Sequence, residues 1–302
     1  MGMDAMRQRV LVLGYGEMGH AMEYMLSARH ELRIWSITGV KDRETTLEQE
    51  VAEAEVILFC LPVNPHYEIA TRISPHLTED SLCVTIAKGL DESGRTAVQV
   101  FETALQHHHY GVMYGPMISE EIRADAYSFA DVAMSDPSQF GKIRSLFHGA
   151  RLVCKEAGDM HGRAWSVILK NVYAIMFGIA DELKLGDNMR GHLMVAAIAE
   201  LSMIVESLGG EIHTPYSYAG LGDLVATGTS EDSHHHALGR QLARGEFDDI
   251  SGEGVHTLRM VEKYGLFDWK IYPLFSLVQH IVSRPENLQA RLQSYLQKIR
   301  TW

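Results

Sequence analysis

Short apolar runs alternate with helical stretches through the first half of the chain, and this alternation limits the possible folds more than any other feature. The runs occupy residues 9–14, 31–36, 55–61, 81–87, 110–115, 131–135 and 151–155. Short apolar runs bounded by turn residues are typical of buried strands. Strands that alternate with helices favour a parallel sheet with crossover helices. We therefore predict an α/β domain up to about residue 156.

The pattern changes after Gly158. Long helical periodicity fills residues 162–183 and 192–209, with few β-branched runs between them. A length of 302 residues suits two domains of about 150 residues each. We predict an α/β domain over residues 1–156 and an all-helical C-terminal domain over residues 157–302.

Charge and composition exclude several classes of partner. The formal net charge of -12 argues against nucleic acid and against an anionic membrane, so a small-molecule substrate is expected. The chain shows neither an apolar signal core near its start nor a run of about 18 apolar residues, which predicts a cytoplasmic protein. The three cysteines lie in apolar runs and are expected to be core thiols rather than disulfides or zinc ligands. We predict no metal site.

The motif GYGEMG follows the first predicted strand and opens a predicted helix. Glycine tolerates positive φ and has no Cβ, so a pyrophosphate can approach the backbone N–H groups at the start of the helix. The strand–turn–helix context distinguishes this motif from an ordinary glycine turn. It predicts a Rossmann-type dinucleotide-binding domain that holds NAD or NADP through Gly14, Tyr15, Gly16, Glu17, Met18 and Gly19.

The choice between NAD and NADP stays open at this stage. An acidic residue that binds the adenosine ribose is expected about 20 residues after the motif, at the end of the second strand. Residues 35–37 read Trp-Ser-Ile and contain no carboxylate. The acidic Asp42 and Glu44 could reach the ribose. The basic Lys41 and Arg43 could instead reach a 2′-phosphate.

Three further loops follow predicted strands and therefore lie at the carboxyl edge of the sheet, where cofactors and substrates bind in such folds. They are CLPVNP, AKGLDESG and YGPMISEEI. We expect Pro62 on the cofactor side and Gly115 on the substrate side. Lys88 stands beside a glycine and suits an anion, although a loop lysine is more often simply solvated.

The stretch 168–182 is apolar on nearly all helical faces except at Lys170 and Asn171. Such a helix is normally buried, and an unpaired buried ammonium is costly. The lysine could extend along the helix to reach water. Alternatively it could act in hydride transfer, because reduction of a ketone leaves negative charge on oxygen and needs a cation that can give a proton. A carboxylate such as Asp223 would help to keep this lysine protonated.

Motifs spread over nearly the whole chain resemble those of the NAD(P)-dependent glycerol-3-phosphate dehydrogenases. The most specific are KNVYAIMFGIADELKLGDN and YAGLGDLVATGTS, and GYGEMG, CLPVNP, AKGL, YGPMISEEI and GEGVHT stand in the matching order. The resemblance implies reversible hydride transfer between NAD(P)H and the C2 carbonyl of dihydroxyacetone phosphate, giving sn-glycerol 3-phosphate. We also expect a homodimer, since a helical second domain often supplies a dimer face.

The resemblance also implies roles for single residues. Lys170 matches the family's proton donor and acceptor, and Asn171, Asp223 and Thr227 match positions that hold the lysine and the substrate. Lys88 matches the family's second active-site lysine, which holds the anionic end of the substrate. On the cofactor side the matching residue is Glu253.

One stretch departs from the family. Where relatives carry a serine followed by arginine and asparagine that grip the substrate phosphate, this chain has Ser233, His234, His235 and His236. Arginine is always charged and binds phosphate bidentately, whereas histidine is about half neutral near pH 6.5. We predict that Ser233, His234 and His235 take this place, with pH-dependent binding. Adjacent helical side chains point about 100 degrees apart, which disfavours a shared metal ion.

Two alternatives follow from this departure. The same chemistry could act on a different small hydroxy acid or polyol derivative. The chain could instead be a catalytically silent NAD(H)-binding sensor. Retention of Lys170 with Asn171, Asp223 and Thr227 argues against a silent protein, which has no chemical need for that set.

Overall fold

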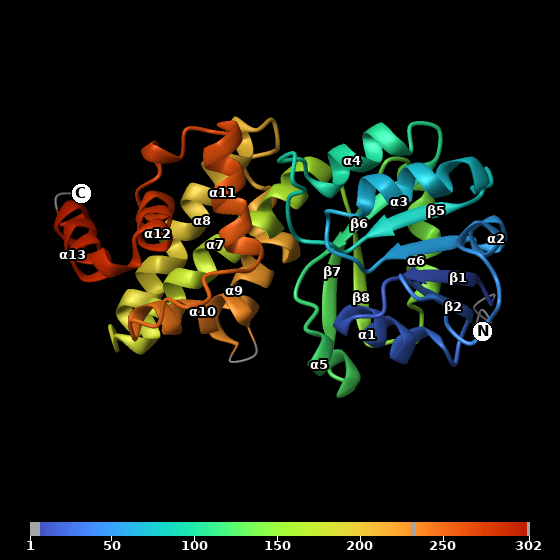
Figure 1. Ribbon diagram of the computed structural model, residues 1–302, viewed down its shortest axis with the longest axis horizontal. Coiled ribbons are helices and arrows are strands. Elements are labelled where there is room, and N and C mark those ends of the chain that lie inside the picture. The colour runs from blue at the N-terminus through green and yellow to red at the C-terminus, as the bar shows by residue number, and fades with distance from the viewer. Residues whose placement is uncertain (1–6, 231–232, 301–302) are drawn as a thin grey trace. The chain divides into compact units, whose positions relative to one another are not determined.

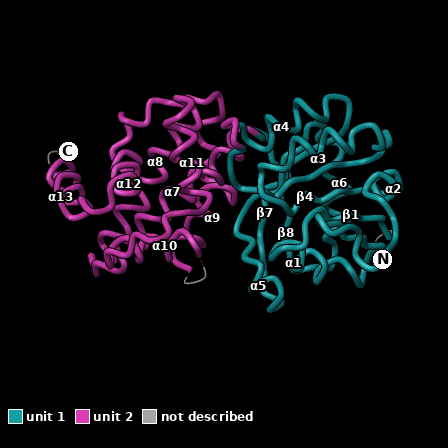
Figure 2. Tube along the Cα trace, viewed as in Figure 1, with its two compact units in different colours: residues 1–91, 95–160 teal, residues 92–94, 161–302 magenta. Residues whose placement is uncertain are grey.

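The computed structural model describes residues 7–230 and 233–300. The chain divides into two compact units, coloured separately in Figure 2. The sheet unit comprises Met1–Asp91 and Arg95–Met160, and the helical unit comprises Glu92–Gly94 and His161–Trp302. The helical unit thus includes a short segment of the sequence that precedes it.

The sheet unit contains one eight-stranded sheet in the order β3-β2-β1-β4-β5-β6-β7-β8 (Figure 1). The strands are β1 (Arg9–Leu13), β2 (Glu31–Ser36), β3 (Gly39–Val40), β4 (Val56–Phe59), β5 (Leu82–Thr85), β6 (His109–Tyr114), β7 (Ser128–Met134) and β8 (Leu152–Ala157). All seven expected runs form strands, and β3 is an addition that the sequence pattern did not predict.

The expected parallel sheet has two antiparallel pairs of strands. Strands β2 and β3 pair antiparallel, as do β6 and β7. Only two residues separate β2 from β3, and a parallel pair needs a crossover of a dozen or more residues. Between β6 and β7 the only helix is the five-residue α5 (Ser119–Arg123), which is too short to return the chain along the sheet.

Helices cover both faces of the sheet (Figure 1). Alternate residues of a strand point to opposite faces, so Val10 and Val12 pack with one set of helices and Leu11 and Leu13 with the other. The first set is α1 (Glu17–Leu26), α5 and α6 (Phe140–Leu146); the second is α2 (Leu47–Glu53), α3 (His66–Ile73) and α4 (Ala97–Ala104). Capping boxes begin α2 and α4, and they fix where these two helices start. Short 3₁₀ turns lie at Ser74–His76 and Pro137–Gln139.

The helical unit is built around α7 (Met160–Glu182), in which every residue from Ala164 to Ala180 is buried. The other helices are α8 (Asp187–Ser207), α9 (Asp223–Thr229), α10 (His234–Ala243), α11 (Glu253–Tyr264), α12 (Pro273–Ser283) and α13 (Leu288–Ile299). Shorter helical turns lie at Thr214–Tyr216, Tyr218–Gly222, Trp269–Ile271 and Pro285–Asn287. In the described part of the chain, none of the helices has both the length and the apolar character that crossing a membrane requires.

Small residues bring the other helices close to α7. A Cβ on Gly178 of α7 would clash with the backbone of His236 on α10, and a Cβ on Gly239 of α10 would clash with the backbone of Ile175 on α7. Two backbones at this distance leave no room for side chains between them. The close contact holds the start of α10 against α7, and this contact positions the histidine-rich stretch.

Candidate active site

The glycine turn has the geometry of an anion-binding loop. Gly14 follows β1 with φ +104, and a Cβ there would clash with the backbone oxygen of Cys60. Gly16 is the N-cap of α1 and has no side chain to cap the helix, and a Cβ on it would meet no atom within 4 Å. The first N–H groups of α1 thus have no side-chain cap at Gly16, and such groups at a helix start suit a pyrophosphate. A Cβ on Gly19 would clash with Gly14, so this glycine allows the helix to start so close to the strand.

The other side chains of the turn are anchored within the sheet unit. Glu17 accepts a hydrogen bond from Arg123 Nη2 at 2.7 Å, and this ion pair offsets a negative charge close to the expected pyrophosphate. Tyr15 donates its hydroxyl hydrogen to Glu23 at 2.6 Å. Met18 packs partly into the core below α1.

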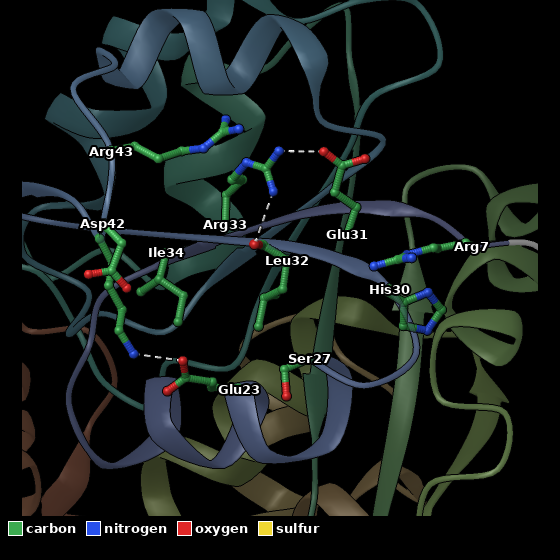
Figure 3. A pocket seen from close by; sticks show the side chains of 11 residues that line it. Arg7, Glu23, Ser27, His30, Glu31, Leu32, Arg33, Ile34, Asp42 and Arg43 are labelled. Atoms are coloured by element: carbon green, nitrogen blue, oxygen red, sulfur yellow. Dashed lines mark hydrogen bonds and ion pairs between the residues drawn. The ribbon is translucent and has the colours of Figure 1, made fainter.

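A polar cavity of about 350 Å³ lies beside β2, lined by residues of α1, β2 and the segment after β3 (Figure 3). Lys41 donates to Tyr15 at 2.6 Å and to Glu23 at 2.7 Å. The hydrogen bond to Glu23 is the main cause that raises the pKa of Lys41. Arg43 pairs with the buried Glu50 at 3.2 Å. Both cations weighed for a 2′-phosphate are thus paired with carboxylates of the chain, and the acidic Asp42 and Glu44 are exposed.

Loops after β5 and β6 meet at the carboxyl edge of the sheet. Lys88 Nζ donates to the backbone oxygen of Gly115 at 3.0 Å. A Cβ on Gly115 would clash with the backbone of Phe129 on β7. Glycine is therefore required where these two segments approach each other. Pro62, in the loop after β4, is exposed. Because β4, β5 and β6 are neighbours in the sheet, all three loops lie along one edge.

Lys170 lies in a buried polar cluster of the helical unit. Its Nζ is 3.2 Å from Asp223 Oδ1 and donates to the hydroxyl of Thr227. The exposed fractions of Lys170, Asp223 and Thr227 are 4%, 3% and 9%. Asp223 and Thr227 stand one turn apart on the same face of α9. Lys170 therefore does not extend to water, and the alternative that it does so is wrong.

The position of Asp223 stabilises its negative charge. It follows directly on the helical turn Tyr218–Gly222, and its Oδ1 lies 3.2 Å from the Nζ of Lys170. An ionised Asp223 in turn favours the ammonium form of Lys170. The cluster thus places a lysine and a carboxylate next to each other in a buried site, where electrostatic interactions are stronger than in water.

Asn171, next to Lys170 on α7, has a partner on α11. Its Nδ2 donates to Glu253 Oε2 at 3.2 Å, and a Cβ on Gly254 would lie 2.8 Å from its backbone oxygen. This hydrogen bond joins α7 to α11 beside Lys170. Glu253, expected on the cofactor side, is therefore joined to the lysine's neighbour.

The histidine stretch separates into three environments. Ser233 caps α10 by accepting from the backbone N–H of His236 at 3.3 Å. His234 is exposed, and His235 lies beside Gly254, where an added Cβ would be 3.3 Å from its Nδ1. His236 is buried, and its Nε2 is 2.8 Å from Asp181 Oδ2. The sequence interpretation missed this last pair, although a buried helical stripe through His236 and Gly239 could have indicated it.

Comparison with known proteins agrees with these features. Residues 42–139 and 159–293 match the family models described as the N-terminus and the C-terminus of NAD-dependent glycerol-3-phosphate dehydrogenase. A glycerol-3-phosphate dehydrogenase (NAD(P)+) of Agrobacterium fabrum is 30% identical over 287 residues, which cover 86% of this chain and 88% of that protein. The chain belongs to this family.

Further relatives support the same assignment. A glycerol-3-phosphate dehydrogenase (NAD(P)+) of Azotobacter vinelandii is 30% identical over 288 residues, covering 85% of this chain and 84% of that protein. The crystal structure of glycerol-3-phosphate dehydrogenase from Coxiella burnetii superposes with a TM-score of 0.81 at 26% identity, covering 96% of this chain and 99% of that one. The predicted family, the Rossmann-type fold with a helical C-terminal domain and the class of NAD(P)-dependent oxidoreductase are confirmed.

Proposed function

We propose that this chain catalyses reversible hydride transfer between NAD(P)H and the C2 carbonyl of dihydroxyacetone phosphate, giving sn-glycerol 3-phosphate. The buried cluster of Lys170, Asp223 and Thr227 is the observation that supports this reaction most strongly. When bound, the nicotinamide would supply or accept the hydride at C2. The side chains of the protein would supply everything else that the reaction needs.

Lys170 would be the general acid and base. In the reduction, its Nζ gives a proton to the oxygen that was the carbonyl; in the oxidation, the amine takes the proton back. Asp223 would favour the ammonium form, so after each reduction the amine would take up a proton from solvent before it donates again. Thr227 accepts one N–H of the lysine and thereby fixes the direction of the others. The Asn171–Glu253 hydrogen bond would fix α7 against α11 next to the reacting groups.

The sheet unit would hold the cofactor and the anionic end of the substrate. The glycine turn would bind the pyrophosphate through the first N–H groups of α1, with Pro62 on the same side. Lys88 and Gly115, already joined by a hydrogen bond, would contact the substrate.

The histidine stretch would replace the arginine of the relatives. Ser233 offers a hydroxyl at the start of α10, while His234 and His235 become phosphate ligands of full charge only when protonated. Substrate binding should therefore be tighter on the acid side of neutrality.

The direct test is oxidation of NADH and of NADPH with dihydroxyacetone phosphate, compared at about pH 6 and about pH 8. The proposal expects turnover, with a KM for the substrate that rises at the higher pH. Absence of turnover at both pH values, with NADH binding shown by fluorescence, would contradict it.

The second candidate is a dehydrogenase of another hydroxy acid or polyol derivative, and the loss of the arginine favours it. A panel of other small ketones, run beside the assay, tests this candidate. NADH binding without oxidation of any panel member would indicate a sensor.

We also propose that the protein acts as a homodimer in the cytoplasm. On α8, Val195 is 67% exposed and Met203 46%, and these two apolar side chains lie two turns apart on one face. Apolar side chains that share a helix face suit burial against a second copy. All three cysteines are free thiols, as is usual in a reducing compartment. Light scattering should give the mass of a dimer for the wild type and a lower mass for Val195→Glu. A monomeric wild type would contradict the dimer. Cell fractionation tests the cytoplasmic location.

A further inference from the structure

His66, the first residue of α3, is a fully buried polar group of the sheet unit that the proposed mechanism does not use. Its side chain is 0% exposed and lies between Phe59 and Phe101, with ring centroids 5.0 Å and 5.6 Å away. Burial lowers the pKa of His66 to about 4. The imidazole is therefore neutral at the pH at which the protein works.

The partners of a neutral imidazole determine which nitrogen carries the hydrogen. Nδ1 lies 2.9 Å from the backbone oxygen of Pro62, which can only accept, so Nδ1 must be the donor. Nε2 then has only a lone pair, so the hydroxyl of Thr85, 2.9 Å away, must donate to it. Thr85 Oγ1 in turn accepts the backbone N–H of Ala87 at 3.0 Å. Each group in this series of hydrogen bonds has a partner, and each bond has one possible direction.

This series of hydrogen bonds connects loops that are far apart in the sequence. Pro62 belongs to the loop after β4, Thr85 is the last residue of β5, and Ala87 precedes Lys88. Lys88 then donates to Gly115 after β6. Three neighbouring strand ends are thus joined by directed hydrogen bonds, all of them within the sheet unit.

We propose that His66 and Thr85 are positioning residues, which set the geometry of the Lys88 loop relative to the Pro62 loop. The proposal rests on the function proposed above for these loops. His66 acts here as a fixed connector and does not exchange protons with the substrate. If the hydroxyl of Thr85 loses its acceptor, it turns freely, and the N–H of Ala87 loses a partner of fixed direction.

Matched substitutions distinguish positioning from simple packing. Thr85→Val keeps the shape but removes the hydroxyl, whereas Thr85→Ser keeps the hydroxyl. His66→Asn places its amide near the position of Nδ1 and keeps the Pro62 bond but loses the Thr85 bond. His66→Gln can place its amide oxygen near the position of Nε2 and keep the Thr85 bond.

The measurements are KM for dihydroxyacetone phosphate, kcat, the dissociation constant for NADH by fluorescence, and the melting temperature, all on the full chain. We expect Thr85→Val and His66→Asn each to raise KM by about tenfold, the size of one lost hydrogen bond. Because both remove the same bond, the double variant should be no worse than either single variant. Thr85→Ser should restore KM, and His66→Gln should lie closer to wild type than His66→Asn.

Two outcomes would overturn the proposal. One is a KM that stays at the wild-type value in Thr85→Val and His66→Asn. The other is a drop in melting temperature that is equal in all four variants with additive effects on KM, as packing alone would give. Failure of the proposed function is visible separately, because the wild type would then not oxidise NADH with this substrate. In that case the NADH dissociation constant is the readout: a rise in His66→Gln, which loses the Pro62 bond, would support the connector, and an unchanged value would contradict it.

Discussion

The glycine turn of the sheet unit and the Lys170 cluster of the helical unit are built in opposite ways. The turn consists of backbone, and it works because Gly14 and Gly19 lack a Cβ that would clash with neighbouring backbone. The cluster consists of side chains from two helices, and Lys170 meets a Thr227 that lies 57 positions further along the chain. A site of the first kind is destroyed by adding an atom, and a site of the second kind by removing one.

Substitutions of two glycines in the turn should have the largest effect on the backbone-built site. Gly14→Ala forces a Cβ against Cys60 at φ +104, so we expect both a loss of NADH affinity and a fall of about 2 kcal/mol or more in the free energy of unfolding. Gly16→Ala has φ -86 and open space, so the fold should keep its stability. Its new Cβ should still weaken NADH binding by about tenfold, because it occupies the space of the pyrophosphate. Fluorescence titration and urea unfolding measure the two quantities. Equal stability losses in both variants would break the comparison.

The next effect tests whether the sheet unit also depends on one buried side chain. The pKa of His66 is lowered from 6.5 to about 4 in the folded state, so the unfolded chain takes up a proton first as the pH falls. Stability due to this group is present above pH 6.5 and is lost as the pH falls toward about 4, by about 3 kcal/mol in total. His66→Gln cannot titrate and should lose less stability over the same range. Urea unfolding at several pH values gives the difference; parallel pH curves for wild type and variant would contradict it.

Substitutions in the side-chain-built site should lower the rate of the reaction without lowering the affinity for NADH. Asp223→Asn removes the charge that favours the ammonium, and we expect kcat to fall by about 100-fold. Thr227→Val removes the hydroxyl that accepts from Lys170 and donates to Asp223, and should cost about tenfold in kcat. Thr227→Ser is the matched control and should retain most of the activity. NADH affinity should not change in any of the three, and a parallel loss of affinity would show that the two sites are not separate in this way.

The glycine turn could be predicted from sequence because all its requirements fall within Gly14–Gly19 and follow from local backbone geometry. Strand alternation likewise gave the seven expected strands. The two-residue β3 and the antiparallel pairing of β6 with β7 could not be predicted, because they depend on short connections rather than on periodicity. These differences leave the carboxyl ends of β4 and β5, and with them the candidate site, unaffected.

The sequence pattern alone predicted only part of the lysine cluster. The apolar surroundings of Lys170 showed that a buried cation needed a reason, but its partners were indicated by resemblance to a family, since no spacing rule joins α7 to α9. The series of hydrogen bonds through His66 was not predicted from the sequence. Its partners, Pro62 and Thr85, are a backbone oxygen and a strand residue that carry no motif. Contacts of this kind appear only once the sheet brings its strand ends together.

Lys170 supplies the proton in the proposed reaction. The most direct measurement is kcat and NADH affinity of Lys170→Ala, with Lys263→Ala, an exposed lysine of α11, as the control. The account predicts that Lys170→Ala loses kcat by about 1,000-fold while it binds NADH as the wild type does, and that the control matches the wild type in both. A Lys170→Ala variant that turns over at the wild-type rate would contradict the account.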